Sequence, residues 1–110
     1  MRARILYHLI KRVAISEQWA DGATFDSYLS DLRRAILAPT ARLLVYERRG
    51  GAIAATITPT DDVLESARQG SGSLPNLLVV YSADRGAIIT GYQYSTWSST
   101  GLPEEVVWLK

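Results

Sequence analysis

The chain has 110 residues, 47% of them hydrophobic and 21% charged, which is typical of a single globular domain spanning 1–110. It contains no cysteine and one histidine, which excludes disulfides, thiolate chemistry and a multi-histidine metal site. The formal net charge of +1 is too small to indicate a nucleic-acid binder by itself. No apolar run approaches the roughly 20 residues of a membrane span. We therefore expect no membrane association, no metal and no other cofactor.

Residues 1–38 are predicted to be a helical segment. Over 2–15 the apolar residues recur with helical spacing on one side, while basic residues gather on another. A polar break over 16–24 separates this helix from the next one. The basic side is acid-free and carries four residues, Arg4, His8, Lys11 and Arg12.

A second helix is predicted over 25–38. Thr24 is suited to cap its start, and Pro39 ends it because proline disfavours helical geometry in the residue before it. Its apolar stripe should pack on one face of a sheet. We expect Phe25, Leu29, Leu32 and Ile36, with Ile5, Leu9 and Val13 of the first helix, to contact Val45, Ile53, Val79 and Ile88.

Residues 42–110 are predicted to form an antiparallel sheet of four or five strands, built from two β-hairpins. Segments rich in β-branched and aromatic residues are separated by glycine-containing turns, as hairpins require. The fold class is therefore α+β, with the helices packed on the sheet. The predicted strands are 43–46 and 52–58 in the first hairpin, 77–81 and 87–94 in the second, and 106–109 as a last strand, with a short helix or turn over 60–69.

The two hairpins resemble each other. Tyr46 and Tyr81 end their first strands, and after four residues Gly51 and Gly86 begin their second strands, at a constant offset of 35 residues. Two readings stay open, an internal repeat or convergence of two hairpins on the same turn chemistry. We favour the second, because turns of this kind select glycine at that place.

His8 is the one side chain that would titrate near neutral pH without perturbation. Neighbouring cations would favour its neutral form, which a general base needs, and would also bind phosphate. The alternative is a solvated helix face. A second candidate surface lies on the last hairpin, where Thr90, Tyr92 and Tyr94 alternate and so share one face of a strand, with Ile89 and Gly91 on the other.

Other side chains extend that surface. Trp97 follows in a polar loop and could stack a base, and Arg48 with Arg49 forms a basic pair at the tip of the first hairpin. Each feature has an ordinary explanation as a half-solvated strand, a loop or a solvated turn. None of the phosphate-binding, nucleotide-binding or hydrolase motifs with fixed spacing occurs in the sequence.

The order of elements, the His8–Arg12 spacing and the segment Ile89-Thr90-Gly91-Tyr92 resemble one known group. This is the barnase/EndoU/colicin/RelE superfamily of small ribonucleases, and in particular the C-terminal toxin domains of contact-dependent inhibition proteins. The resemblance implies metal-independent cleavage of RNA, commonly tRNA, by transesterification from the ribose 2′-OH. It also implies a cognate immunity protein that blocks the site.

Carried onto this sequence, the resemblance makes His8 the general base or acid and Arg12 the group that stabilises the charged phosphate. Thr90 and Tyr92 would position the phosphate or share in proton transfer. The substrate-binding candidates are Arg4, Lys11, Arg48, Arg49, Tyr94 and Trp97.

The resemblance further implies delivery to the cytoplasm of a target bacterium as part of a larger cell-surface protein, although this chain carries no targeting signal. The alternative function is a non-catalytic immunity or antitoxin protein, or another protein-binding module.

Overall fold

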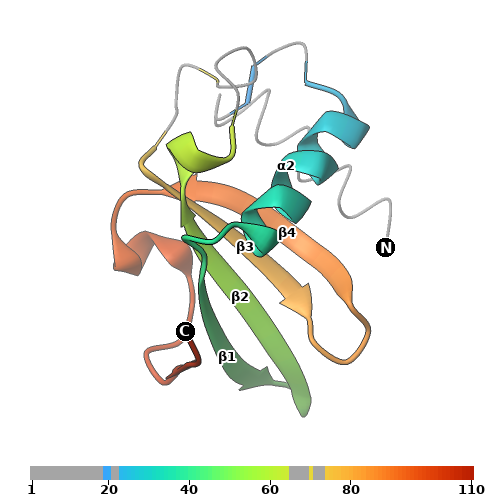
Figure 1. Cartoon of the computed structure of the whole chain (residues 1–110). Coiled ribbons are helices and arrows are strands. Elements are labelled where there is room, and N and C mark those ends of the chain that lie inside the picture. Colours follow the sequence, from blue (N-terminus) through green and yellow to red (C-terminus); the bar gives the residue numbers. More distant parts are fainter. Residues whose placement is uncertain (1–18, 21–22, 65–69, 71–73) are drawn as a thin grey trace.

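The computed structural model describes residues 19–20, 23–64, 70 and 74–110, and Figure 1 shows helix α2 lying across one face of an antiparallel sheet. The five strands occur in the order β4-β3-β2-β1-β5. This arrangement confirms the predicted α+β fold, while the predicted helix over 2–15 lies outside the described residues. The elements are α2 (Phe25–Leu37), β1 (Arg42–Arg48), β2 (Gly51–Pro59), the 3₁₀ helix η2 (Thr60–Asp62), β3 (Asn76–Ser82), β4 (Ala87–Tyr94), the 3₁₀ helix η4 (Trp97–Thr100) and β5 (Val107–Trp108).

Helix α2 begins at the predicted cap. The backbone N–H of Ser27 donates to Oγ1 of Thr24 at 3.1 Å, and the backbone N–H of Thr24 donates to Oγ of Ser27 at 2.8 Å. This reciprocal capping box pairs two amide groups that the first helical turn would leave without partners. The helix ends at Leu37, one residue earlier than predicted, because Ala38 precedes Pro39 and adopts an extended conformation.

The helix contacts the sheet closely at Gly91 of β4. A Cβ atom at this position would lie 2.3 Å from Cδ2 of Leu32, a residue with no exposed surface. Beside this contact, the Tyr28 hydroxyl donates to the Gly91 carbonyl at 2.7 Å. Gly91 is therefore the place where the absence of a side chain lets α2 pack directly on the sheet.

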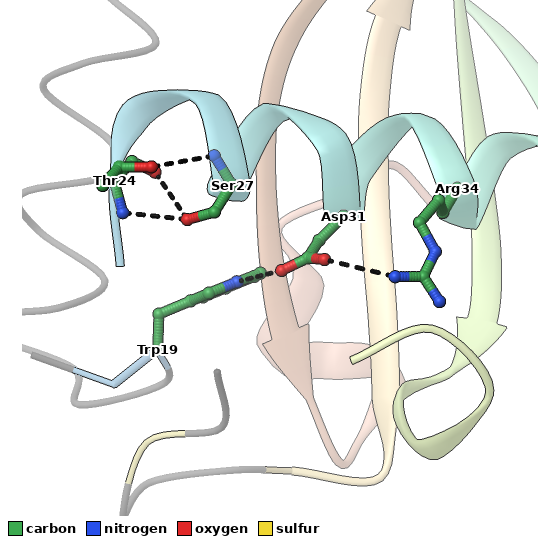
Figure 2. Close-up of polar contacts among 5 residues, drawn as sticks. All are labelled: Trp19, Thr24, Ser27, Asp31 and Arg34. Carbon is green, nitrogen blue, oxygen red and sulfur yellow. Dashed lines mark hydrogen bonds and ion pairs between the residues drawn. The ribbon is translucent and has the colours of Figure 1, made fainter. Parts of the chain in front are cut away.

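Trp19 lies in the stretch predicted to be a polar break, yet it is only 1% exposed. Its indole N–H donates to Oδ2 of Asp31 at 3.1 Å (Figure 2). Its ring meets that of Tyr28 edge-on, with the ring centroids 4.9 Å apart. Asp31 is fully buried, and its other oxygen lies 4.0 Å from a guanidinium nitrogen of the half-exposed Arg34. The buried carboxylate thus ties the chain before α2 to the helix itself.

We expect Asp31→Ala to lower the free energy of unfolding by about 1–3 kcal/mol, because the buried Trp19 N–H would lose its acceptor. Asp31→Asn should retain much of that stability, since its side-chain carbonyl can still accept the bond. Arg34→Ala serves as the matched control and should cost less than about 1 kcal/mol, because its side chain is half-exposed and its ion-pair contact with Asp31 is long, at 4.0 Å. Urea denaturation followed by tryptophan fluorescence measures all three. Equal losses in Asp31→Ala and Arg34→Ala would contradict the assigned role of the buried bond.

The sheet buries apolar side chains on both faces. The face under α2 holds one cluster, centred on Leu32 and Val79. The opposite face, called the open face below, holds a second cluster of Leu44, Ala55, Ile57, Leu78, Val80 and Tyr94. Ile53 packs against the open-face cluster, so its predicted contact with the helices is wrong.

The register explains why Ile53 lies on the other face. Val45 pairs with Ala54, which pairs with Tyr81 on its other side, so Val45 and Tyr81, 36 residues apart, lie in one row across the sheet with Ala54 between them. The sequence similarity between the hairpins has an offset of 35 residues. Because strand side chains alternate, a shift by one residue places Tyr46 and Tyr81 on opposite faces. The turns themselves differ, because Gly50 has the positive φ in the first hairpin, whereas Gly86, the counterpart of Gly51, has it in the second. The choice between a repeat and convergence stays a prediction.

None of the helices in the described ranges is long and apolar enough to cross a membrane.

Candidate functional site

A cavity of about 490 Å³ lies on the open face of the sheet. Three segments far apart in the sequence form its walls: the β1–β2 turn, the middle of β4 and the loop after η4. The residues that line it are Tyr46, Arg48, Arg49, Ile53, Val80, Ile89, Thr90, Tyr92, Thr100, Gly101 and Leu102.

The β1–β2 turn places two guanidinium groups at this cavity. Arg48 pairs with Gly51, so the hairpin loop consists of two residues, Arg49 and Gly50, with φ angles of +53° and +77°. Positive φ at both positions is the signature of a type I′ turn, which strongly favours Asn-Gly. Arg49 therefore occupies a left-handed conformation that costs an ordinary residue about 1–2 kcal/mol.

The wall from β4 contains a β-bulge. Tyr81 pairs with Ile88 and Val80 pairs with Thr90, so Ile89 is left without an opposite partner. The bulge turns the side chain of Ile89 toward the open face, where Ile89 lines the cavity together with Thr90 and Tyr92. Strict alternation had predicted Ile89 on the opposite face, and the bulge is the reason that this prediction is wrong.

The two hydroxyl groups of this wall differ in their bonding. The Tyr92 hydroxyl donates to the carbonyl of Thr100, so it anchors the loop that forms the third wall. The Thr90 hydroxyl is buried and has no hydrogen-bond partner among the described residues. A rotation of χ1 by one staggered well would move that hydroxyl into the place now held by the methyl group of the same side chain. Thr90 thus retains a hydrogen-bonding group that the surrounding protein does not use.

Tyr46 is a cavity residue that the sequence reasoning did not identify. Partial burial raises the pKa of its hydroxyl, and the nearby Arg48 opposes this effect only in part. The phenol is therefore protonated at neutral pH and can donate a hydrogen bond. The signal was present in the sequence, because residues two apart in a strand share a face and Arg48 was already a candidate.

The other candidates are placed as follows. Tyr94 is 7% exposed and packs in the open-face cluster, so it supports the sheet and does not present its ring to a ligand. Burial raises the pKa of its hydroxyl, with a smaller opposing effect from Arg42.

Trp97 is exposed and stands on η4, beside the cavity but not in its wall. Four candidates, Arg4, His8, Lys11 and Arg12, lie outside the described residues.

The cavity is lined by two arginines together with hydroxyl-bearing, aromatic and aliphatic residues. Guanidinium groups pair with phosphate oxygens in a fork geometry, and hydroxyls add further donors. Within the ranges that the structure describes, no three His, Asp or Glu side chains gather as possible metal ligands. The composition of the cavity lining therefore suits a phosphate group flanked by an apolar or aromatic moiety.

Comparison with models of protein families, with curated proteins and with solved structures found no match to this chain.

Proposed function

We propose that this chain is a metal-independent endoribonuclease domain of the interbacterial toxin type, and that it binds RNA at the cavity on the open face. One observation supports this proposal above the others. Arg48 and Arg49, from the first hairpin, line the same cavity as Thr90 and Tyr92, from the last hairpin. Four of the candidate residues predicted from the sequence therefore line one cavity.

The proposed reaction is transesterification. A general base, which we assign to His8, takes the proton of the ribose 2′-OH while the 2′-oxygen forms a bond to phosphorus. The bond from phosphorus to the 5′-oxygen breaks, and that oxygen takes a proton from a general acid. Negative charge gathers on the phosphate oxygens at the transition state, where cations have their greatest effect. Arg48 and Arg49 would supply this stabilisation, together with Arg12.

Tyr92 has a different role in this proposal from the one the resemblance implies. Its proton is already donated to the Thr100 carbonyl, so its ring forms a wall and its hydroxyl fixes the loop. Thr90 and Tyr46 then remain as the hydroxyl donors to the phosphate.

The proposal extends to the biological setting that the resemblance implies. The substrate would be tRNA, and a cognate immunity protein would cover the cavity. An immunity protein that does so should present carboxylates to Arg48 and Arg49. Delivery would take place as part of a larger cell-surface protein that enters a target bacterium.

Incubation of the purified chain with tRNA in the presence of EDTA tests the activity. We expect cleavage that leaves a 2′,3′-cyclic phosphate and a 5′-hydroxyl, because no water takes part in the first step. His8→Ala should lower the rate by about 10²-fold or more, the contribution typical of general acid–base catalysis. Arg85→Ala, at the tip of the other hairpin, is the control and should leave the rate unchanged. Loss of all cleavage in EDTA, or an unchanged rate in His8→Ala, would refute the mechanism.

A second candidate function is a protein-binding module, and one observation favours it. A groove of about 680 Å³ runs beside β5, with an apolar floor that includes Val45 and Val107 and with two carboxylates, Glu47 and Glu105. Such a groove suits an apolar segment with a basic residue. On this reading the chain would cleave no RNA, and Glu47→Lys would weaken its complex with a partner while Arg49→Asn would not.

A further inference from the structure

Three side chains form a stack at the edge of the open face. The Arg42 guanidinium carbon lies 4.1 Å from the centroid of the Trp108 ring, and the ring centroids of Trp108 and Trp97 are 5.9 Å apart with a tilt of 44°. Both indoles remain about a third exposed, at 38% for Trp108 and 37% for Trp97. This set of residues, Arg42, Trp97 and Trp108, is called the aromatic stack below.

The aromatic stack is on the same face of the sheet as the cavity. Trp108 pairs with Leu44, and Arg42 pairs with Ile57, and both partners belong to the open-face cluster. On β1, the cavity residue Tyr46 follows Leu44 by two residues, a distance of about 7 Å. On η4, the Thr100 hydroxyl donates to the Trp97 carbonyl at 2.7 Å, and Thr100 lines the cavity. Two separate connections therefore place the stack next to the cavity.

We propose that the aromatic stack binds a nucleobase of single-stranded RNA next to the phosphate held in the cavity. The inference rests on the proposed function and names its substrate class. Bases stack on indole rings whatever their identity, whereas bases within a duplex have both faces covered by their neighbours. The chain should accordingly cleave loops and single strands and spare paired regions.

Exposure and orientation of the rings support this role. Arg42 covers one face of Trp108 and holds it in place, while Trp97 is joined to the loop by backbone contacts and keeps much of its surface in water. An indole that served only to close the loop onto β5 would gain more stability by full burial. The guanidinium of Arg42 also places a positive charge where the adjoining RNA phosphates would pass.

Binding of an uncleavable RNA tests the inference. The probe is a 2′-O-methyl oligonucleotide of eight residues, which lacks the 2′-OH nucleophile, compared with the same strand in a blunt duplex. Trp97→Ala should weaken binding of the single strand by roughly 5- to 150-fold, the range for one stacked base. Trp97→Phe, which can still stack, should bind within a few-fold of the original chain. Leu37→Ala is the control and should not change the affinity. It removes an apolar side chain that is 82% exposed and does not belong to the aromatic stack.

The outcomes separate this inference from the proposed function. If the original chain binds the single strand and Trp97→Ala binds it equally well, the inference is wrong and the proposed function stands. Equal affinity for single strand and duplex would also overturn it. If the original chain binds neither, both fail. If Trp97→Ala keeps its RNA affinity but loses affinity for an inhibitory protein, the stack is a protein-docking site. Thermal melting of each variant shows that the change is not loss of folding.

Discussion

Leu32→Ala is expected to lower the free energy of unfolding by about 2–5 kcal/mol, the range for a fully buried leucine. The side chain has no exposed surface, and both of its methyl groups lie against the Gly91 backbone. Removing the side chain leaves a cavity at the contact between α2 and β4. The helix cannot move in to close it, because the capping box at Thr24 and the hydrogen bond from Tyr28 to Gly91 hold it in place. Urea denaturation measures the loss, and a value below about 1 kcal/mol would contradict the packing.

Gly91→Ala should be destabilising by about 1–3 kcal/mol for the opposite reason, since the new Cβ overlaps the Leu32 methyl groups. In the double variant the added methyl occupies part of the space that Leu32 vacates. We therefore expect the double variant to lose less stability than the sum of the two single losses. Leu44→Ala on the open face is the matched control, and its loss should add to that of Gly91→Ala. Additive losses for Leu32 and Gly91 would show that the two residues do not share one contact.

Replacing both arginines of the β1–β2 turn, as Arg48→Ala with Arg49→Asn, should lower the rate of RNA cleavage by about 10²-fold or more. Loss of one well-placed group that stabilises transition-state charge has an effect of that size. The free energy of unfolding should not fall with it. Asparagine adopts the left-handed conformation at position 49 more readily than arginine does, and Arg48 is exposed. An increase in stability of up to about 1 kcal/mol is expected.

The dependence of RNA binding on salt provides a second measurement on the same variant. Each phosphate contact on a single strand contributes about 0.7 to the slope of log affinity against log salt concentration, because it releases counterions. The double variant should flatten the slope by about 1.4, while Arg85→Ala at the tip of the other hairpin should leave it unchanged. A variant with the original slope and rate would place the RNA elsewhere on the molecule.

The fold was largely predictable because its elements are specified locally. Thr24 and Pro39 mark the ends of α2 through capping and steric restriction, which act over a few residues. The second hairpin is similarly clear, and β4 has the predicted bounds Ala87–Tyr94. The last strand is shorter than predicted, Val107–Trp108, since it pairs with only part of β1.

The site was predictable only in part, for reasons that lie in tertiary structure. The sequence pointed to four residues of the cavity lining, namely Arg48, Arg49, Thr90 and Tyr92. Their proximity depends on the strand order, which local patterns do not encode. The bulge at Ile89 breaks the alternation on which the choice of face relied. Trp19 stands among polar residues, and its burial depends on Asp31, twelve positions away. The loop wall, Thr100 to Leu102, has the composition of an ordinary solvated turn, and a hydrogen bond from Tyr92 of β4 ties it to the sheet.

The strand order has a consequence for how the chain folds. From β1 to β4 each strand pairs with the next one in the sequence. The β1–β2 and β3–β4 pairings close loops of two and four residues and require little loss of chain entropy, while the β2–β3 pairing closes the longer connection 60–75. The contact between Tyr28 and Gly91, in contrast, spans 63 residues. The meander is therefore suited to form before α2 docks on it, and the cavity walls supplied by the two hairpins would assemble early. Substitutions under α2 should then act mainly by speeding unfolding, while substitutions within the hairpins should slow folding.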